Sequence, residues 1–527
     1  ENEFSYPGLE PVEELLIHHQ YQDALSLLIP LYQEKPNEPA ILRLLGACYY
    51  HLSKYDLTIE IAREWLKIRP NCGLAHHYMA QSIIKLRDMH NVLIKEFRES
   101  FSKTSFQKSY PYLDQVFINF NLCSDELQKV LLLGLFPFKH FLKVLADSGA
   151  TVYLMSFHQL LWHCPYLQKY RGLRSIDLRL ADDLGGQGGY HTTCDANQEM
   201  DVICGRYNVA FHEIGHLIHS ILNDEQKQKL KQLFTSAKKK GFTLDWYADQ
   251  NVREYFAQGI EAYLSERKLP GQNDTHQHTV HELKEKDPLL FEFIHALTTL
   301  QPNLSHEIEG ILLKVNESKK LSDRISILEN ALQIHPNHPK LIRRLGDVYY
   351  EIEDHKKCLE IHAEALKLNN ESVDLKIACA IDLLDIEGKV DQAVDFLLQD
   401  YDTFSNHEEF MHTLSYILIE KCDYSKALII LKKLLRQFPY PDPYGITIPD
   451  PFYLSGSCYS HLDKPQKAIM MFQKSIKLNG TSLPSVVALA FAFLKIKDFK
   501  QCQNTVKLIQ QIDPNHESIE FLLKRCQ

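Results

Sequence analysis

The sequence predicts a mostly α-helical protein in which two runs of helical repeats flank a central α+β domain. Segments 42–71 and 342–370 align with each other, so both ends of the chain share one pattern. Between 101 and 304 that pattern fails, glycines cluster at 183–191, and residues 188–205 alternate like strands. We therefore expect repeats over 1–100 and 305–527, and a separate domain over 101–304.

Composition narrows the class of protein. The chain has 527 residues, too many for one core, and its 45% hydrophobic and 24% charged residues are ordinary for a globular protein. A net charge of -10 argues against nucleic acid or an anionic membrane surface as a general partner. We find no apolar run long enough to span a membrane, and the N-terminal residues lack the order of a signal peptide.

Cysteine usage predicts the compartment. The 12 cysteines are scattered and form no CxxC pair. In a chain of this length such cysteines are typical of buried thiols in a reducing environment. We expect the protein to work in a cytoplasm.

The repeats share a frame of small and aromatic residues. Gly46, Tyr49 and Tyr50 align with the equivalent residues of segment 342–370, and Gly456 continues the frame. The spacing of about 34 residues resembles the tetratricopeptide repeat, a pair of antiparallel helices. In this frame we expect repeats to begin near residues 5, 39, 73, 305, 339, 373, 408, 449 and 483. The small residues should let the two helices of a unit approach closely.

Two irregularities interrupt the C-terminal repeats. The repeat at 373 slips by one residue, and the proline-rich insert 438–453 lengthens one turn. We expect an extended loop there, which is also a candidate partner contact. Repeats of this kind present a surface to a peptide or protein, so they predict a protein partner.

Residues 211–220, FHEIGHLIHS, carry an HExxH pattern. His212 and His216 are four residues apart, so a helix projects both from one face, at a separation suited to two ligands of Zn2+. Glu213 lies beside them, where it can take a proton from water. Apolar neighbours predict a mostly buried helix, in which unpaired His and Glu would be costly. For Gly215 within it, we expect close approach of a strand or substrate backbone.

A catalytic zinc needs a third protein ligand, and the helix expected within 245–264 offers Glu254. Apolar residues follow it directly, which predicts that its face points inward. Arg253 and Glu261 are expected nearer solvent. The sequence therefore predicts His212, His216 and Glu254 as zinc ligands.

The HEIGH segment followed by residues 247–264 resembles the gluzincin domain of the anthrax lethal factor family, which includes proline-specific bacterial endopeptidases. The resemblance covers residues 206–266. It implies a zincin-like peptidase domain with Glu213 as general base and Tyr247 as the residue that stabilises the oxyanion. The family has glutamate where this chain has Gln258, so a partner of a histidine ligand would keep its place but lose its charge.

Other residues near the motif have weaker claims. The segment containing Gly189 and Tyr190 is either an edge strand that pairs with substrate, as in relatives of this kind, or a structural hairpin. His219 lies beyond the reach of a metal held by His212 and His216, so we expect a pocket-lining or core residue. The HEEFMH segment, 407–412, is expected on the repeat surface, and residues 275–281 in a solvated loop.

These observations predict a zinc metalloendopeptidase whose repeats recruit a protein substrate. The alternative is a repeat adaptor with a catalytically inactive, zinc-bound peptidase-like domain. Retention of Glu213 favours the enzyme, because an adaptor needs no general base. The resemblance to toxins and endopeptidases also implies a secreted bacterial factor. The cytoplasm in which it works would then be that of a host cell.

Overall fold

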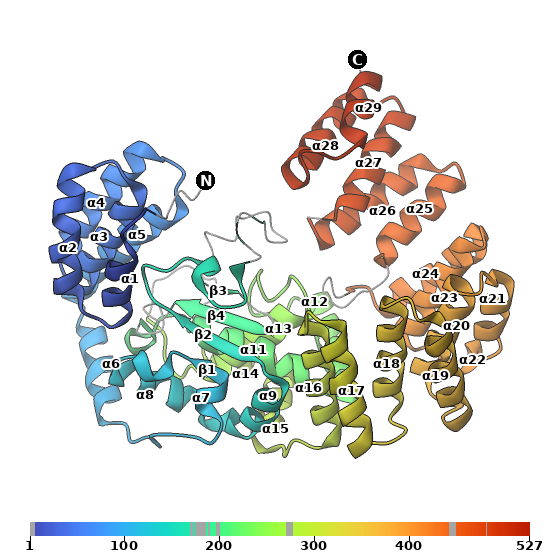
Figure 1. The fold of residues 1–527 in the computed structure, drawn as a ribbon, viewed down its shortest axis with the longest axis horizontal. Coiled ribbons are helices and arrows are strands. Elements are labelled where there is room, and N and C mark those ends of the chain that lie inside the picture. The colour runs from blue at the N-terminus through green and yellow to red at the C-terminus, as the bar shows by residue number, and fades with distance from the viewer. Residues whose placement is uncertain are drawn as a thin grey trace.

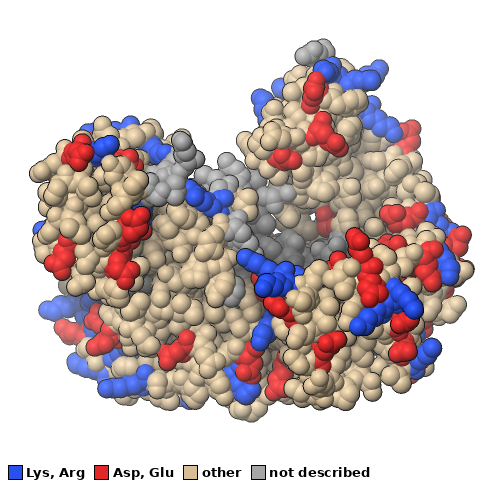
Figure 2. Space-filling model, viewed as in Figure 1, with Lys and Arg blue, Asp and Glu red and all other residues tan. Residues whose placement is uncertain are grey.

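The computed structural model describes residues 6–168, 171, 173, 186–187, 190–195, 201–269, 278–441, 449–480 and 482–526. The chain is mostly helical, and two runs of paired helices rise on either side of a central part that contains a small sheet (Figure 1). Basic and acidic side chains are interspersed over the face seen in Figure 2. No described helix is long and apolar enough to cross a membrane.

The N-terminal run consists of paired antiparallel helices. Its helices are α1 (Glu10–Ile17), α2 (Tyr21–Glu34), α3 (Pro39–His51), α4 (Tyr55–Ile68), α5 (Gly73–Asp88) and α6 (Val92–Lys103). The helices that begin at Pro39 and Gly73 confirm the repeat starts expected near 39 and 73. The run has a core of its own, centred on the fully buried Trp65 and Tyr78, whose rings meet edge to face.

The C-terminal run follows the same pattern. Its helices are α16 (Leu304–Glu317), α17 (Leu321–Ile334), α18 (Pro339–Glu351), α19 (His355–Leu368), α20 (Val373–Asp385), α21 (Val390–Leu398), α22 (Tyr401–Phe404), α23 (Glu408–Glu420), α24 (Tyr424–Gln437), α25 (Pro451–His461), α26 (Pro465–Leu478), α27 (Leu483–Lys495), α28 (Phe499–Ile512) and α29 (Ser518–Arg525). The slip expected in the repeat at 373 is confirmed: a longer turn separates α20 from α21, and the short α22 precedes the next unit.

Glycines bring the paired helices of a unit together, as the sequence predicted. A Cβ atom added to Gly456 in α25 would lie 2.5 Å from the ring of Phe472 in α26. One added to Gly346 in α18 would lie 2.0 Å from His362 in α19. At Gly46 the nearest ring, that of Tyr78, belongs to the next unit instead. Only glycine allows these contacts, so close packing of the helices explains why glycine recurs at this position of the repeats.

The central part holds a four-stranded sheet of order β1-β2-β4-β3. The strands are β1 (Phe117–Ile118), β2 (Thr151–Met155), β3 (Gly186–Gln187) and β4 (His191–Asp195). β1 and β4 both pair parallel to β2, with Val152 opposite Thr192, and β3 pairs antiparallel to β4. β4 therefore pairs on both sides, and β3, which belongs to the same predicted segment, forms an antiparallel pair with it at the edge of the described sheet.

Helices cover this sheet and enclose the largest apolar core of the protein, which runs from Tyr110 to Leu297. The longer helices are α8 (Asp125–Leu135), α11 (Val209–Ile221), α12 (Asp224–Lys240), α13 (Val252–Tyr263) and α15 (Pro288–Thr299). Shorter ones are α7 (Leu113–Val116), α9 (Leu142–Ser148), α14 (Val280–Lys286) and the 3-10 turns η1 (Phe120–Leu122), η2 (Phe136–Phe141), η3 (Leu161–His163) and η6 (Asp201–Cys204). α11 packs between α13 and strand β4.

Helix α12 connects the central part to the C-terminal repeats through ion pairs. Lys227 pairs with Glu309 of α16 at 2.5 Å, and Lys231 pairs with Glu408 of α23 at 2.5 Å. In the second half of α12 the ring of Phe234 meets that of Tyr440, a described residue of the proline-rich insert. Residues 442–448 of that insert lie outside the described residues. A cavity of about 740 Å³ opens beside these pairs, between the start of α12 and α16, α18 and residues 368–374.

The prediction that residues 407–412 lie on the repeat surface is wrong for His412. This residue is buried in α23, and its Nε2 atom lies 2.9 Å from the carbonyl oxygen of Pro449. His407 instead caps α23 by accepting a hydrogen bond from the amide of Phe410. Of the loop expected at 275–281, residues 275–277 lie outside the described residues, while His278 lies 3.4 Å from a carboxylate oxygen of Asp245.

Candidate metal centre

Two capped helices carry the predicted ligands. Asn208 begins α11 by accepting a hydrogen bond from the amide of Phe211, and His212 and His216 follow on one face. Asn251 begins α13 by accepting hydrogen bonds from the amides of Arg253 and Glu254. Glu254 therefore lies in the first turn of α13, where the helix dipole favours a carboxylate.

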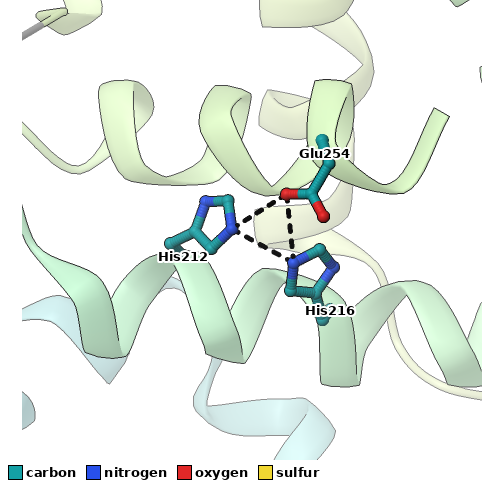
Figure 3. Close-up of side chains that lie close together, drawn as sticks. All are labelled: His212, His216 and Glu254. Atoms are coloured by element: carbon teal, nitrogen blue, oxygen red, sulfur yellow. Dashed lines mark hydrogen bonds and ion pairs between the residues drawn. The ribbon is translucent and has the colours of Figure 1, made fainter. Parts of the chain in front are cut away.

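The structure brings His212, His216 and Glu254 together (Figure 3). The Nε2 atoms of His212 and His216 lie 3.1 Å apart. Oε2 of Glu254 lies 3.1 Å from Nε2 of His212 and 3.4 Å from Nε2 of His216. Ligands of a tetrahedral zinc at about 2.0–2.1 Å lie about 3.3–3.4 Å from one another. The three atoms therefore form one face of a tetrahedron of the size that zinc requires.

The chemistry of the cluster also fits a cation. Two imidazole nitrogens that face each other at 3.1 Å cannot both act as acceptors without repulsion, unless a proton or a metal lies between them. Oε2 of Glu213 is buried and has no hydrogen-bond partner within the described part of the chain, and Oε2 of Glu254 contacts the two histidine nitrogens as ion-pair partners. Buried polar atoms without partners are costly, and a cation would compensate the carboxylate.

Burial and charge set the acidity of the two carboxyl groups in opposite directions. Burial raises the pKa of Glu213 to about 8, an effect that His212 partly offsets and that the charge of Glu254 reinforces. Burial alone would raise the pKa of Glu254 as well, but His216 and His212 outweigh it and hold that pKa below its ordinary value. Glu254 is thus the anionic candidate ligand, and Glu213 is a carboxyl group that can exchange a proton near neutral pH.

Gly215 explains how the two helices come close enough. A Cβ atom at this position would lie 2.9 Å from Cα and 3.3 Å from Cβ of Ala257 in α13. The close approach that the sequence predicts is therefore made by a helix backbone, and neither by a strand nor by a substrate. Only with glycine here can Glu254 reach the histidines across the contact between α11 and α13.

Tyr247 and Gln258 lie next to the ligands. The ring of Tyr247 meets that of His212 with centroids 5.9 Å apart. Gln258, one turn after Glu254, accepts a hydrogen bond from the hydroxyl of Tyr207 at 2.9 Å. The ring of Tyr207 also packs against His212 with centroids 5.9 Å apart. Gln258 therefore contacts a residue that supports His212.

The remaining candidates contact other parts of the domain. His219 is buried and its ring packs against Phe256, while burial lowers its pKa well below the ordinary value. The hydroxyl of Tyr190 donates a hydrogen bond to the carbonyl of Ser148 at the end of α9. Gly189 lies outside the described residues.

Glu261 corrects one prediction. The sequence suggested a side chain nearer solvent, but Glu261 is only 1% exposed. It accepts a hydrogen bond from the amide of Asn208 at 3.0 Å and forms an ion pair with Lys268. This buried carboxylate holds the start of α11 against α13, and only the partner residues make its burial tolerable.

Sequence reasoning missed Tyr207 and Asp245 as residues around the centre. Oδ1 of Asp245 accepts hydrogen bonds from the amides of Tyr247 and Ala248, so it fixes the turn that carries Tyr247. Its other oxygen accepts one from Gln258 at 3.3 Å. An aspartate two residues before a candidate tyrosine is a recognisable turn signal. Nothing in the spacing of Tyr207 indicates its contact with His212.

We predict that Gly215→Ala weakens the centre without touching a ligand. The added methyl group must push α13 away from α11, and overpacking of this kind costs about 1–3 kcal/mol of the free energy of unfolding. Zinc affinity should fall as well, because the displacement of α13 moves Glu254 away from the histidines. Thermal unfolding and zinc titration measure both effects. Ser220→Ala, a small change later in α11, should alter neither, and unchanged zinc affinity in Gly215→Ala would contradict the account.

Comparisons with known proteins find one repeat unit by sequence and solved structures of low identity. Residues 449–482 match the tetratricopeptide repeat family model. Similar solved structures include pilF from Pseudomonas aeruginosa, which is 19% identical and matches over 36% of this chain and 82% of its own, with a TM-score of 0.32. Yeast Tom70 is 12% identical over 98% and 93% of the two chains, with a TM-score of 0.33. No curated protein matches the chain.

The matched unit consists of α25 and α26, and the same helix pairing recurs on both sides of the central part. The chain therefore contains tetratricopeptide-like repeats, and the cluster of His212, His216 and Glu254 lies outside the matched unit.

Proposed function

We propose that the protein is a zinc-dependent metalloendopeptidase whose tetratricopeptide-like repeats recruit its protein substrate. The observation that carries the proposal is the convergence of His212, His216 and Glu254 at 3.1–3.4 Å with Glu213 buried beside them. Two helix segments some forty residues apart supply one ligand set, and this set is the His/His/Glu combination of zinc peptidases.

In this proposal His212, His216 and Glu254 hold the zinc. When bound, zinc would supply a Lewis acid that makes water a stronger acid and polarises a peptide carbonyl. Glu213 is next to the ligands, and its carboxyl group can accept a proton from the attacking water and return it to the leaving amine. Tyr247, whose ring contacts His212, is the candidate donor to the oxygen that becomes negative.

A second function is favoured by the repeats themselves. Tetratricopeptide-like units bind proteins, and residues 449–482 match such a unit, whereas Gln258 departs from the peptidase pattern. In that case the protein is an adaptor, and the His/His/Glu cluster holds zinc only as a structural ion. The two functions share the protein partner and differ in whether a peptide bond is broken.

The experiment that separates them is a cleavage assay on the full chain loaded with zinc. We expect new peptide ends in a proteome-derived peptide library, which mass spectrometry identifies. Dialysis against a chelator should remove the activity, and added Zn2+ should restore it, because the proposed reaction requires the zinc that the three side chains hold. A chain that holds zinc and cuts nothing in the library would leave the adaptor as the function.

A further inference from the structure

A second group of metal-binding side chains lies in the C-terminal repeats. Cys358 and His362 are one turn apart on α19, and Asp382 faces them from α20. All three are buried: Cys358 is 0%, His362 1% and Asp382 6% exposed. Sγ of Cys358 lies 3.7 Å from Nδ1 of His362 and 3.4 Å from Oδ1 of Asp382, and Nδ1 of His362 lies 2.7 Å from Oδ2 of Asp382.

The packing of a repeat does not require polar residues at these three positions. In the frame that aligns Gly346 with Gly456, the three equivalent positions in the matched repeat and its successor are apolar and buried: Ala468, Phe472 and Ala492. A buried thiol, imidazole and carboxylate thus replace an ordinary repeat core. Apolar packing is usually at least as stable as a buried ion pair of similar volume, so stability alone gives no reason for the exchange.

We propose that Cys358, His362 and Asp382 form a structural binding site for a divalent metal of the zinc class, separate from the His/His/Glu centre. Nε2 of His362 lies 3.0 Å from the carbonyl oxygen of Arg343, to which it can donate a proton. This contact leaves Nδ1 as the nitrogen that faces sulfur and carboxylate. Metal-binding histidines are oriented in this way by a backbone carbonyl on the opposite nitrogen.

The distances fit with one adjustment. For zinc with sulfur at about 2.3 Å and nitrogen or oxygen at about 2.0–2.1 Å, sulfur lies about 3.5–3.6 Å from the other ligands. The two sulfur distances of 3.7 and 3.4 Å bracket that value. Sulfur contacts Oδ1 of Asp382 and Nδ1 contacts Oδ2, so the carboxylate must turn to offer one oxygen to the ion. That oxygen must lie about 0.6 Å farther from Nδ1 than Oδ2 now does, because Oδ2 and Nδ1 are in hydrogen-bond contact.

The exchange of protons for metal leaves the charge of the buried site unchanged. Counted from a doubly protonated His362 ring, a carboxylate at Asp382 and a protonated Cys358, the metal-free site has no net charge. Binding of M2+ releases the thiol proton and the Nδ1 proton, two in all. The product contains a thiolate, a carboxylate, a neutral imidazole and the dication, which again sum to zero.

The site would join neighbouring repeats at the point where their pattern slips. α19 belongs to the repeat at 339, and α20 begins the irregular repeat at 373. An ion held there would fix the second helix of one unit against the first helix of the next.

The test uses the full chain and cobalt as the probe. Cobalt bound to a thiolate gives a charge-transfer absorption band in the near ultraviolet, which a His/His/Glu centre lacks because it contains no sulfur. We expect this band in the wild-type protein and two equivalents of bound metal per chain. Cys358→Ser should lose the band and one equivalent, whereas His212→Ala should lose one equivalent and keep the band.

Cys458→Ser is the matched control, since Cys458 is equally buried in another repeat, and it should keep both the band and the metal. If Cys358→Ser fails to fold by circular dichroism, Asp382→Asn keeps the shape of the site and should weaken the thiolate site at least tenfold. A cobalt-saturated wild-type protein without the band, or a band that survives in Cys358→Ser, would overturn the proposal. Peptidase activity is measured separately, so a negative result for the thiolate site and a negative result for the proposed peptidase can be told apart.

Discussion

Glu213→Gln is expected to abolish peptide cleavage while the protein keeps its zinc. A positioned general base contributes about 10²- to 10⁴-fold to the rate, so kcat should fall by that factor. Glutamine has nearly the same shape but cannot take a proton. Because Glu213 is not one of the three clustered ligands, its replacement should leave metal content unchanged.

Metal analysis and kcat on a peptide found in the library measure the two quantities in one preparation. Glu285→Gln, the same chemical change at an exposed position of α14, should leave kcat and zinc content at the wild-type values. A Glu213→Gln protein that cleaves at the wild-type rate would show that Glu213 is not the base. A protein that loses zinc instead would assign Glu213 to the coordination of the metal.

Glu254→Ala is expected to lower zinc affinity by more than about 100-fold, because loss of a residue that merely supports a ligand already costs about 10- to 100-fold. The substitution removes the only carboxylate of the three clustered ligands and leaves two facing imidazoles. Activity at limiting zinc should disappear with the metal. Competition titration against a chromophoric chelator measures the affinity.

The control for this prediction is Glu285→Ala, which changes the same residue type at an exposed site. Glu254→Asp is a sharper comparison, since it keeps the charge but shortens the reach, and it should give an affinity between those of the wild type and Glu254→Ala. Wild-type zinc affinity in Glu254→Ala would exclude the His/His/Glu ligand set. Excess zinc that fully restores cleavage would limit the role of Glu254 to affinity.

The sequence predicted those features that depend on local spacing. The repeat starts at 39, 73, 339, 373 and 408 coincide with or lie next to observed helix starts, because each repeat encodes its own turns and its own apolar face. His212 and His216 share a face because any helix places residues four apart on one side. The caps of α11 and α13, Asn208 and Asn251, also act through amides two or three residues away, although they were not among the predictions.

Contacts between helices were predicted less well. Glu261 was expected nearer solvent and His412 on the surface, yet both are buried. Their burial depends on partners at distant positions: Asn208 and Lys268 for Glu261, and Pro449 for His412. The spacing of a charged residue on a helix does not reveal whether another element brings a donor to it.

By itself, therefore, the sequence determined the repeats, the zinc-like motif and the pairing of His212 with His216, since each follows from the period of a helix. Only the tertiary structure decided that Ala257 packs on Gly215, which brings Glu254 to the histidines. It alone gathered Cys358, His362 and Asp382 in one buried site. The physical reason is that packing faces and approach distances between helices depend on the volumes of many side chains at once, whereas helical spacing depends on the backbone alone.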